Sequence, residues 1–200
     1  MSPASDADVI GRSLVDAQAF GAIFDRHAEA LLRYAARRAG REVAEGLIGE
    51  LFRIAFERRK SYDSSYPSAR PWLYGIAANL LQKHRRGEAR RLRANARLAS
   101  EVRVSDGRRT ARASSAADAQ LLLPSVVEAI EALPQGEREA LLLYAWEELP
   151  YDAIAAALNV PVGTVRSRLN RARARLRELD PAERRTGSRS SQPRSARRRK

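Results

Sequence analysis

Residues 151–171, YDAIAAALNVPVGTVRSRLNR, decide the fold prediction for this chain of 200 residues. Apolar residues recur at spacings of three and four on both sides of 159–161, where Asn, Val and Pro interrupt the pattern and favour a turn. The stretch therefore predicts a short helix over 151–158, a turn, and a long helix over about 162–179. Two helices of these lengths around a tight turn are typical of a helix-turn-helix.

Charge is segregated along this part of the chain. No Asp or Glu occurs from 153 through 177, whereas six Arg follow the turn. Packing through Ile154, Val165 and Leu169 would leave polar side chains of the second helix facing outward, where Arg can pair with guanine and Asn with adenine. A basic solvated helix is the alternative, but the preceding helix and the turn favour DNA binding. The outward-facing set is Thr164, Arg166, Ser167, Arg168, Asn170 and Arg171.

The N-terminal half of the chain also predicts helices. Apolar residues recur at helical spacing over 20–35 and again over 44–56, and each set forms one stripe. Ser, Asp and Pro in SYDSSYPSARP, residues 61–71, favour turns. Pro71 then fits the first turn of a third helix that ends near 83–86. The predicted fold class is all-α, with two small helical domains.

The net charge of +13 lies mostly in two segments. Residues 85–113 hold 10 basic and 3 acidic side chains, and residues 184–200 hold 8 basic side chains and no acidic one. Both segments are poor in large apolar residues, so they bury too little area to offset the entropy lost on ordering. The predicted organisation is a first domain over 10–87, a flexible basic linker over 88–121, a second domain over 122–180 and a disordered basic tail over 181–200.

Composition excludes several classes of function. The chain has no Cys and two His, His27 and His84, which leaves no cluster for a metal and no His-centred catalytic triad. We therefore predict no catalytic residue, no metal and no cofactor. A sequence pI of about 11.1 points to a polyanionic partner, nucleic acid before membrane. The sequence shows neither a long apolar stretch nor a signal peptide, so we expect a cytoplasmic protein.

Two motifs, in this order along the chain, carry a family resemblance. PWLYGIAANLLQKHRR, residues 71–86, closes the N-terminal block, and PVGTVRSRL, residues 161–169, opens the last helix. The segments around them resemble region 2 and region 4 of bacterial RNA polymerase sigma factors of the extracytoplasmic-function (ECF) group, and together they cover a little over half of the chain. The resemblance implies a protein that performs no catalysis and gives core RNA polymerase its promoter specificity and strand opening.

In that family, region 4 binds the β flap of the polymerase and reads the −35 element as duplex DNA. The matching positions here are Thr164, Arg166, Ser167, Arg168 and Arg171. Region 2 reads the −10 element on the non-template strand and captures an extruded base, which needs stacking surfaces and cations along the backbone. The matching positions are Tyr62, Asp63, Asn79, Lys83 and Arg86. Trp72 and Tyr74 belong either to this surface or, more in keeping with their spacing, to the core.

Region 2 of the family also binds the clamp helices of the β′ subunit, through a helix that usually reads Ala-Glu-Asp-Leu-Val-Gln-Glu-Val-Phe. The matching residues 44–52 read AEGLIGELF, with Gly46 and Gly49 in place of the Asp and the Gln. Each Gly costs a helix about 1 kcal/mol relative to Ala, and two polar contacts would be missing. The polymerase-binding set predicted on this helix is Leu47, Glu50, Leu51 and Phe52.

The predicted linker must be extended when both promoter elements are held. Its 34 residues, 88–121, have a contour of roughly 110 Å, but as a coil they place their ends only about 30–35 Å apart. Two turns of duplex span about 70 Å. In this family the linker threads the polymerase near the RNA exit path. We expect a monomer when free and no membrane insertion, and an anti-sigma partner is typical of the family.

Two other classes of function stay open. A helix-turn-helix regulator that binds duplex DNA without core polymerase would act as a dimer on a two-fold operator, and Gly46 and Gly49 are its best support. A nucleoid-type protein that uses the two Arg-rich segments would bind DNA without sequence preference and with a steep salt dependence.

Overall fold

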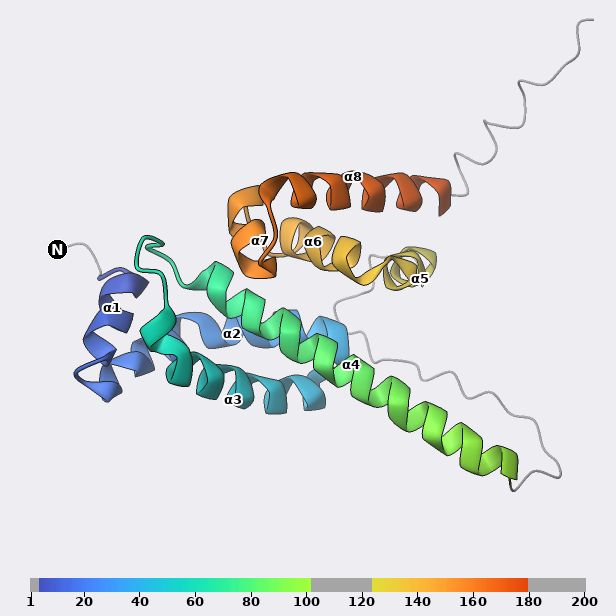
Figure 1. The fold of residues 1–200 in the computed structure, drawn as a ribbon, viewed down its shortest axis with the longest axis horizontal. Helices are drawn as coiled ribbons and strands as arrows, with labels where there is room; N and C mark the ends of the chain where they lie inside the picture. Colours follow the sequence, from blue (N-terminus) through green and yellow to red (C-terminus); the bar gives the residue numbers. More distant parts are fainter. Residues whose placement is uncertain (1–3, 102–123, 180–200) are drawn as a thin grey trace, which may run out of the picture.

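The computed structural model describes residues 4–101 and 124–179, and every regular element in these ranges is a helix. The elements form two groups, the N-terminal bundle and the C-terminal bundle (Figure 1). The N-terminal bundle consists of α1 (Asp6–Ser13), η1 (Ala17–Phe20), α2 (Gly21–Ala39), α3 (Arg41–Arg58), η2 (Arg59–Ser61) and α4 (Arg70–Glu101). The C-terminal bundle consists of α5 (Pro124–Ala132), α6 (Gln135–Ala145), α7 (Tyr151–Leu158) and α8 (Val162–Leu179). The predicted all-α fold class is confirmed.

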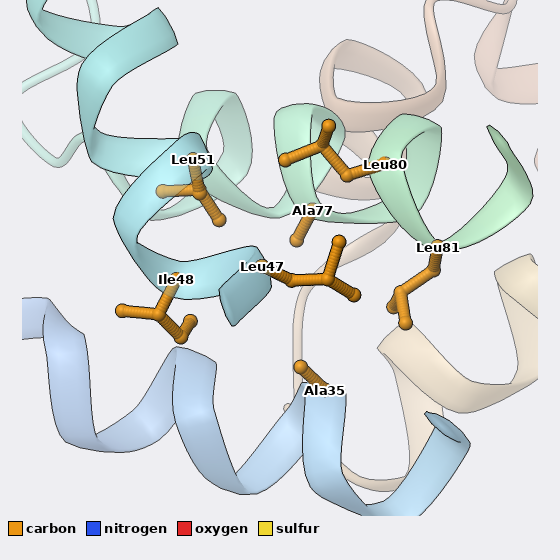
Figure 2. Close-up of a pocket in the computed structure, with 7 residues that line it drawn as sticks. All are labelled: Ala35, Leu47, Ile48, Leu51, Ala77, Leu80 and Leu81. Carbon is orange, nitrogen blue, oxygen red and sulfur yellow. The ribbon is translucent and has the colours of Figure 1, made fainter. Parts of the chain in front are cut away.

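A single residue, Gly40, separates α2 from α3. Its φ of 82° lies in the left-handed region, which glycine adopts without steric cost, so the chain reverses there and packs α3 against α2. Side chains from three helices then close a core around a small apolar pocket, among them Ala35 of α2, Leu51 of α3 and Leu81 of α4 (Figure 2). The three longest helices of this bundle therefore share one apolar centre.

The helix α4 is longer than the sequence predicts. The predicted end lies near 83–86, but α4 continues to Glu101, so the first residues of the predicted linker are helical. Arg, Ala and Leu have high helix propensity, and an ion pair between Arg91 and Glu88, 3.1 Å apart, spans one turn. A basic segment with few apolar residues is thus as compatible with an exposed helix as with a coil. The remaining parts of the predicted linker and the predicted tail, 102–121 and 181–200, lie outside the described residues.

The C-terminal bundle contains the predicted helix-turn-helix. The bounds of α7 and α8 agree with the predicted ones. Asn159 ends α7 with a φ of 50°, a left-handed conformation that Asn tolerates better than most residues. Ile154, Val165 and Leu169 are fully buried, as their spacing predicts. The local pattern therefore suffices to define these two helices.

The two bundles are in contact. α7 packs on α4, whereas α8 packs on α6 and α7, on the side of the C-terminal bundle that faces away from α4 (Figure 1). The helix predicted to read DNA is therefore accessible while the bundles are docked. Across the described ranges, no helix is both long enough and apolar enough to span a membrane.

Candidate nucleic-acid and polymerase interfaces

The outward side of α8 carries the residues predicted to read the −35 element. Arg166 is exposed, and Thr164 and Ser167 are half-buried in the first turns. Ser167 donates its hydroxyl hydrogen to the Thr164 carbonyl at 2.9 Å, and the Thr164 N–H donates to the Pro161 carbonyl at 2.9 Å. An exposed Arg on a helix whose first turns are fixed in this way matches the docking of a helix N-terminus in the major groove.

Two residues at the start of α6, Gly136 and Glu137, lie next to three of the other arginines of α8. Gly136 lies so close to Arg168 that a Cβ at position 136 would be 2.9 Å from the guanidinium carbon. Arg171 Nε donates to Glu137 Oε1 at 3.0 Å, and Arg175 Nε lies 3.5 Å from Glu137 Oε2. The Glu137 side chain is 7% exposed and that of Arg171 is 56% exposed. The sequence predicts Arg168 and Arg171 as DNA contacts, but it gives no sign that Glu137 orients Arg171.

Tyr62 and Asp63 lie in the loop between η2 and α4. The Tyr62 ring packs on Trp72 with centroids 5.2 Å apart, and its hydroxyl donates to the Tyr66 carbonyl at 2.5 Å. Partial burial raises the pKa of Tyr62 to about 12, so this side chain is neutral at pH 7. Asp63 is exposed, and its hydrogen bonds with Ser65 lower the pKa of its carboxyl group. Tyr62 of this loop and Trp72 of α4 therefore form an aromatic pair, and the loop also carries the ionised carboxylate of Asp63.

The remaining residues predicted for the −10 element lie on α4. Asn79, Lys83 and Arg86 are all exposed, and spacings of four and three place them on one face of the helix. Tyr74 differs from them, because it is 1% exposed and hydrogen-bonds to Glu147 of the other bundle. Of the two aromatic residues whose role was left open, Tyr74 is thus interior in this structure.

Asp6, which the sequence does not single out, fixes the position of the loop that carries Tyr62. The Asp6 N–H donates to the Pro67 carbonyl at 3.0 Å, and its carboxylate accepts from the Ala69 N–H at 2.9 Å. Arg26 and His27 of α2 contact the same carboxylate at 2.8 and 2.7 Å. Burial acts to raise the pKa of Asp6, but the hydrogen bonds from Ala69 and Arg26 and the charge of His27 outweigh it and lower the pKa.

The four residues predicted to bind the polymerase lie on two sides of α3. Leu51 and Phe52 are buried in the core of the N-terminal bundle, and Leu47 is half-buried at its edge. Glu50 accepts hydrogen bonds from Arg53 at 2.7 and 2.8 Å, which lower the pKa of its carboxyl group. Leu47 and Glu50 are therefore the accessible members of this set, whereas Leu51 and Phe52 anchor the helix.

Gly46 and Gly49 are exposed on the same helix. A Cβ at either position would meet no atom within 4 Å, and neither residue has a positive φ. Packing therefore does not require glycine at these positions, and nothing in the structure explains the departure from the family pattern.

Comparison with known proteins matches both bundles. A family model described as Sigma-70 region 2 matches residues 23–91, and one described as Sigma-70, region 4 matches residues 124–176. The ECF RNA polymerase sigma factor SigM of Bacillus subtilis is 31% identical over 147 residues, which are 70% of this chain and 80% of that protein. The ECF RNA polymerase sigma factor EcfG of Rhodopseudomonas palustris is 34% identical over 110 residues, 54% of this chain. The chain spans about half, 55%, of the length of EcfG.

Two solved structures share the fold. CnrH, in complex with the cytosolic domain of CnrY, is 25% identical with a TM-score of 0.59, and the match covers 87% of this chain and 96% of that chain. The sigma factor RpoE from Bartonella quintana, in complex with the anti-sigma factor NepR, is 24% identical with a TM-score of 0.57, and the match covers 80% and 95%. The fold, both family models and the SigM match agree: this chain belongs to the sigma-70 family of RNA polymerase sigma factors, in its ECF group.

Proposed function

We propose that this chain binds core RNA polymerase and directs promoter recognition and strand opening, with one domain over 10–87 and the other over 122–180. The observation that carries the proposal is the helix-turn-helix of α7 and α8: Arg166 is exposed on α8, and α8 lies on the side of the C-terminal bundle that faces away from α4 (Figure 1). In this role the chain performs no catalysis, because the polymerase makes the RNA. A cytoplasmic location and a monomeric free state fit the same role.

Duplex recognition would use α8 in the major groove. Arg166 would approach a base edge, since it is exposed near the N-terminus of the helix. Arg171 and Arg175 are anchored through Nε on Glu137, so their terminal nitrogen atoms would face phosphates. Thr164, Ser167 and Arg168 complete the proposed −35 surface, in which the phosphate contacts set the register and the base contacts set the specificity.

Single-strand recognition would use the N-terminal bundle. The packed rings of Tyr62 and Trp72 provide an aromatic surface for an unstacked base, and Asp63 follows Tyr62 on its loop. Asn79, Lys83 and Arg86 follow on one face of α4 and would track the backbone of the displaced strand. Asp6 contributes indirectly, because it ties the loop to α1 and α2.

Polymerase binding would use two surfaces. The outward side of α3, with Leu47 and Glu50, would bind the clamp helices of the β′ subunit, and the C-terminal bundle would bind the β flap. Because Gly46 and Gly49 are exposed with open space around them, Gly46→Asp combined with Gly49→Gln is expected to raise the affinity for core polymerase. Titration of labelled chain with purified core enzyme measures this affinity. An unchanged or lower affinity would contradict the placement of the clamp on this face.

Run-off transcription with purified core polymerase tests the proposed function. The template carries the candidate promoter, and reactions with core enzyme alone provide the background. A transcript that depends on the chain is expected, and Arg166→Ala should reduce it more than Arg177→Ala, which removes the same charge from the last turn of α8. The absence of such a transcript, together with the absence of core binding, would overturn the proposal.

The relatives favour this role over a regulator that acts without polymerase, since such a regulator needs no region 2. A sigma factor would act as a monomer on an asymmetric promoter, whereas such a regulator would act as a dimer on a two-fold operator. The solved relative from Bartonella quintana is bound to an anti-sigma factor, and we extend to this chain the proposal of a partner of that kind.

A further inference from the structure

The start of α6 holds a buried carboxylate against α8, its neighbour in the C-terminal bundle (Figure 1). Glu137 lies in the first turn of α6, and its side chain is 7% exposed. Its Oε1 accepts a hydrogen bond from Arg171 Nε at 3.0 Å, and its Oε2 lies 3.5 Å from Arg175 Nε. One carboxylate therefore contacts two cations of the helix that we propose reads duplex DNA.

Glu137 depends on these cations. Within the part of the chain that the structure describes, its buried Oε2 accepts no hydrogen bond, so the ion pair with Arg175 is the contact that this oxygen has. A buried carboxylate is stable only when cations or hydrogen-bond donors surround it. The positive end of the α6 dipole contributes, because Glu137 lies in the first turn and Pro134 at the N-cap offers no capping side chain. The carboxylate therefore holds the Nε edges of both arginines toward α6.

This anchoring leaves the other end of each guanidinium group accessible. The side chains of Arg171 and Arg175 are 56% and 47% exposed, and the Nη1 and Nη2 atoms form an edge that can bind a phosphate bidentately. Arg168 lies against Gly136, where a Cβ would be 2.9 Å from its guanidinium carbon. Spacings of three and four place the three arginines on one face of α8. The start of α6 therefore lies along a row of three cations.

The orientation of such a row matters for sequence discrimination. Phosphate contacts set the register of a recognition helix on DNA, and base contacts in that register set the specificity. A flexible arginine reaches several phosphates and so permits several registers. We propose that Glu137 is a positioning residue for sequence discrimination: it holds Arg171 and Arg175 in one orientation, so that α8 docks in the register in which Arg166 meets its base pair. This inference rests on the proposed role of α8 in reading duplex DNA.

The same carboxylate weakens the general attraction to DNA. Its negative charge offsets one arginine charge, and the affinity for any duplex depends on how many phosphates the cations neutralise. Removal of the charge of Glu137 should therefore raise the affinity for duplexes of any sequence, whereas loss of the orientation should reduce the preference among sequences. A residue that only stabilises the bundle would lower both quantities when it is replaced. Opposite signs therefore distinguish positioning from a purely structural role.

Binding of the full chain to a pool of duplexes with randomised sequence measures both quantities without a known promoter. Fluorescence anisotropy gives the mean affinity, and sequencing of the bound fraction gives the enrichment of preferred sequences. Glu137→Gln should raise the mean affinity about two- to fivefold and steepen the slope of log affinity against log salt by about one. It should also lower the enrichment several-fold.

Glu128→Gln is the matched control for net charge, because it removes the same charge from an exposed position on α5. This variant should leave the enrichment unchanged. Equal enrichment for the two glutamine variants would overturn the inference, and so would a parallel loss of mean affinity and enrichment for Glu137→Gln. A parent chain that enriches no sequence would overturn it as well.

Two further variants separate orientation from charge. Glu137→Asp keeps the charge but ends one methylene group short of the arginines, so the mean affinity should stay at the parent value while the enrichment falls. In an Arg166→Ala background, Glu137→Gln should cause no further loss of preference at the base pair that Arg166 reads. Enrichment that Glu137→Asp leaves unchanged, or an equal loss in both Arg166 backgrounds, would contradict action through the register.

Run-off transcription with core polymerase separates this inference from the proposed function. A parent chain that enriches sequences from the pool but supports no transcript would overturn the proposed function and leave the role of Glu137 intact. A chain-dependent transcript, together with equal enrichment for Glu137→Gln and Glu128→Gln, would overturn the role of Glu137 and uphold the proposed function.

Discussion

Two glutamates of α6 pair with arginines in different surroundings: Glu137 with exposed ones and Glu139 with a buried one. Glu137 pairs with Arg171 and Arg175 of its own bundle, whose side chains are 56% and 47% exposed. Glu139 pairs with Arg38 of the other bundle, and this Arg side chain is 4% exposed. The first pair can exchange its carboxylate for a phosphate in water, whereas the second exchanges partners only when the bundles separate.

The helix α6 therefore serves two tasks through two glutamates. On the α8 side, a buried carboxylate orients cations whose terminal nitrogen atoms remain accessible to DNA. On the α2 side, the same residue type closes an interface between bundles. Glu137 and Glu139 are therefore not part of a solvated acidic face, because both carboxylates are buried and paired with arginines.

Removal of the Arg38–Glu139 pair should have the largest effect. Arg38→Ala leaves Glu139 without its cation, and we expect a loss of about 3–5 kcal/mol of docking free energy. Differential scanning calorimetry should show one cooperative transition for the parent chain and two for the variant. Arg33→Ala on the same helix removes an exposed pair with Glu29 and should melt as the parent does. A single unchanged transition for Arg38→Ala would show that the Arg38–Glu139 pair does not stabilise the docking of the bundles.

Asp6 provides a buried carboxylate that acts within one bundle. Asp6→Asn should destabilise the N-terminal bundle by about 2–3 kcal/mol at pH 7, because charged hydrogen bonds become neutral ones. Since folding lowers the pKa of Asp6, its contribution is present above the unfolded value near pH 4 and is lost as the pH falls through the folded value. Urea unfolding at several pH values measures this, with Asp25→Asn as the exposed control. A difference that stays constant into strong acid would contradict the role of Asp6.

Substitutions on the exposed side of α8 should change DNA binding rather than the stability of the chain. Arg166→Ala should weaken binding to the promoter duplex by about 1–3 kcal/mol and relax the preference at one base pair. Arg177→Ala should weaken binding equally on all sequences or leave it unchanged. Fluorescence anisotropy with promoter and scrambled duplexes measures both. An equal loss on both duplexes for Arg166→Ala would assign this residue to phosphate.

The smallest expected effect comes from replacing the two glutamates of α6 one at a time. Glu137→Gln should cost the C-terminal bundle about 1 kcal/mol, since its arginine partners are half exposed, and it should lower the ratio of specific to nonspecific duplex binding by releasing Arg171. Glu139→Gln should leave that ratio unchanged and lengthen the distance between bundles. Identical behaviour of the two variants would remove the distinction between the two glutamates.

The helix-turn-helix could be predicted because its signals are local. Ile154, Val165 and Leu169 form a periodic set, and Asn159 lies where the turn needs a left-handed residue. The end of α4 could not be predicted, because arginine-rich sequence supports either an exposed helix or a coil, and the ion pair between Arg91 and Glu88 forms only in the helix. Composition alone does not separate these states.

No local pattern in the sequence predicts the docking of the bundles. Arg38 and Glu139 are 101 residues apart, and each resembles the many solvated charges of this chain. Gly75 and Gly87 are both glycines of α4. Of these two, only Gly75 lies against the backbone of another helix, α7. Asp6 and Glu137 escaped prediction for a related reason, since their roles depend on which helices become neighbours. Burial of a polar side chain, seen only in the structure, reveals the roles of the charged residues. The close approach of two backbones reveals that of Gly75.

The distance between the bundles, measured in the free chain and in its complex with core polymerase and promoter DNA, shows whether the bundles dock in the free chain and separate on the promoter. Because the chain has no Cys, Gln18→Cys and Ala174→Cys, both at exposed positions, place one spin label on each bundle. We predict a short, narrow distribution in the free chain and an increase of tens of ångströms in the complex, because the two elements lie about 70 Å apart. The same short distance in both states, with promoter-dependent transcription intact, would contradict the account.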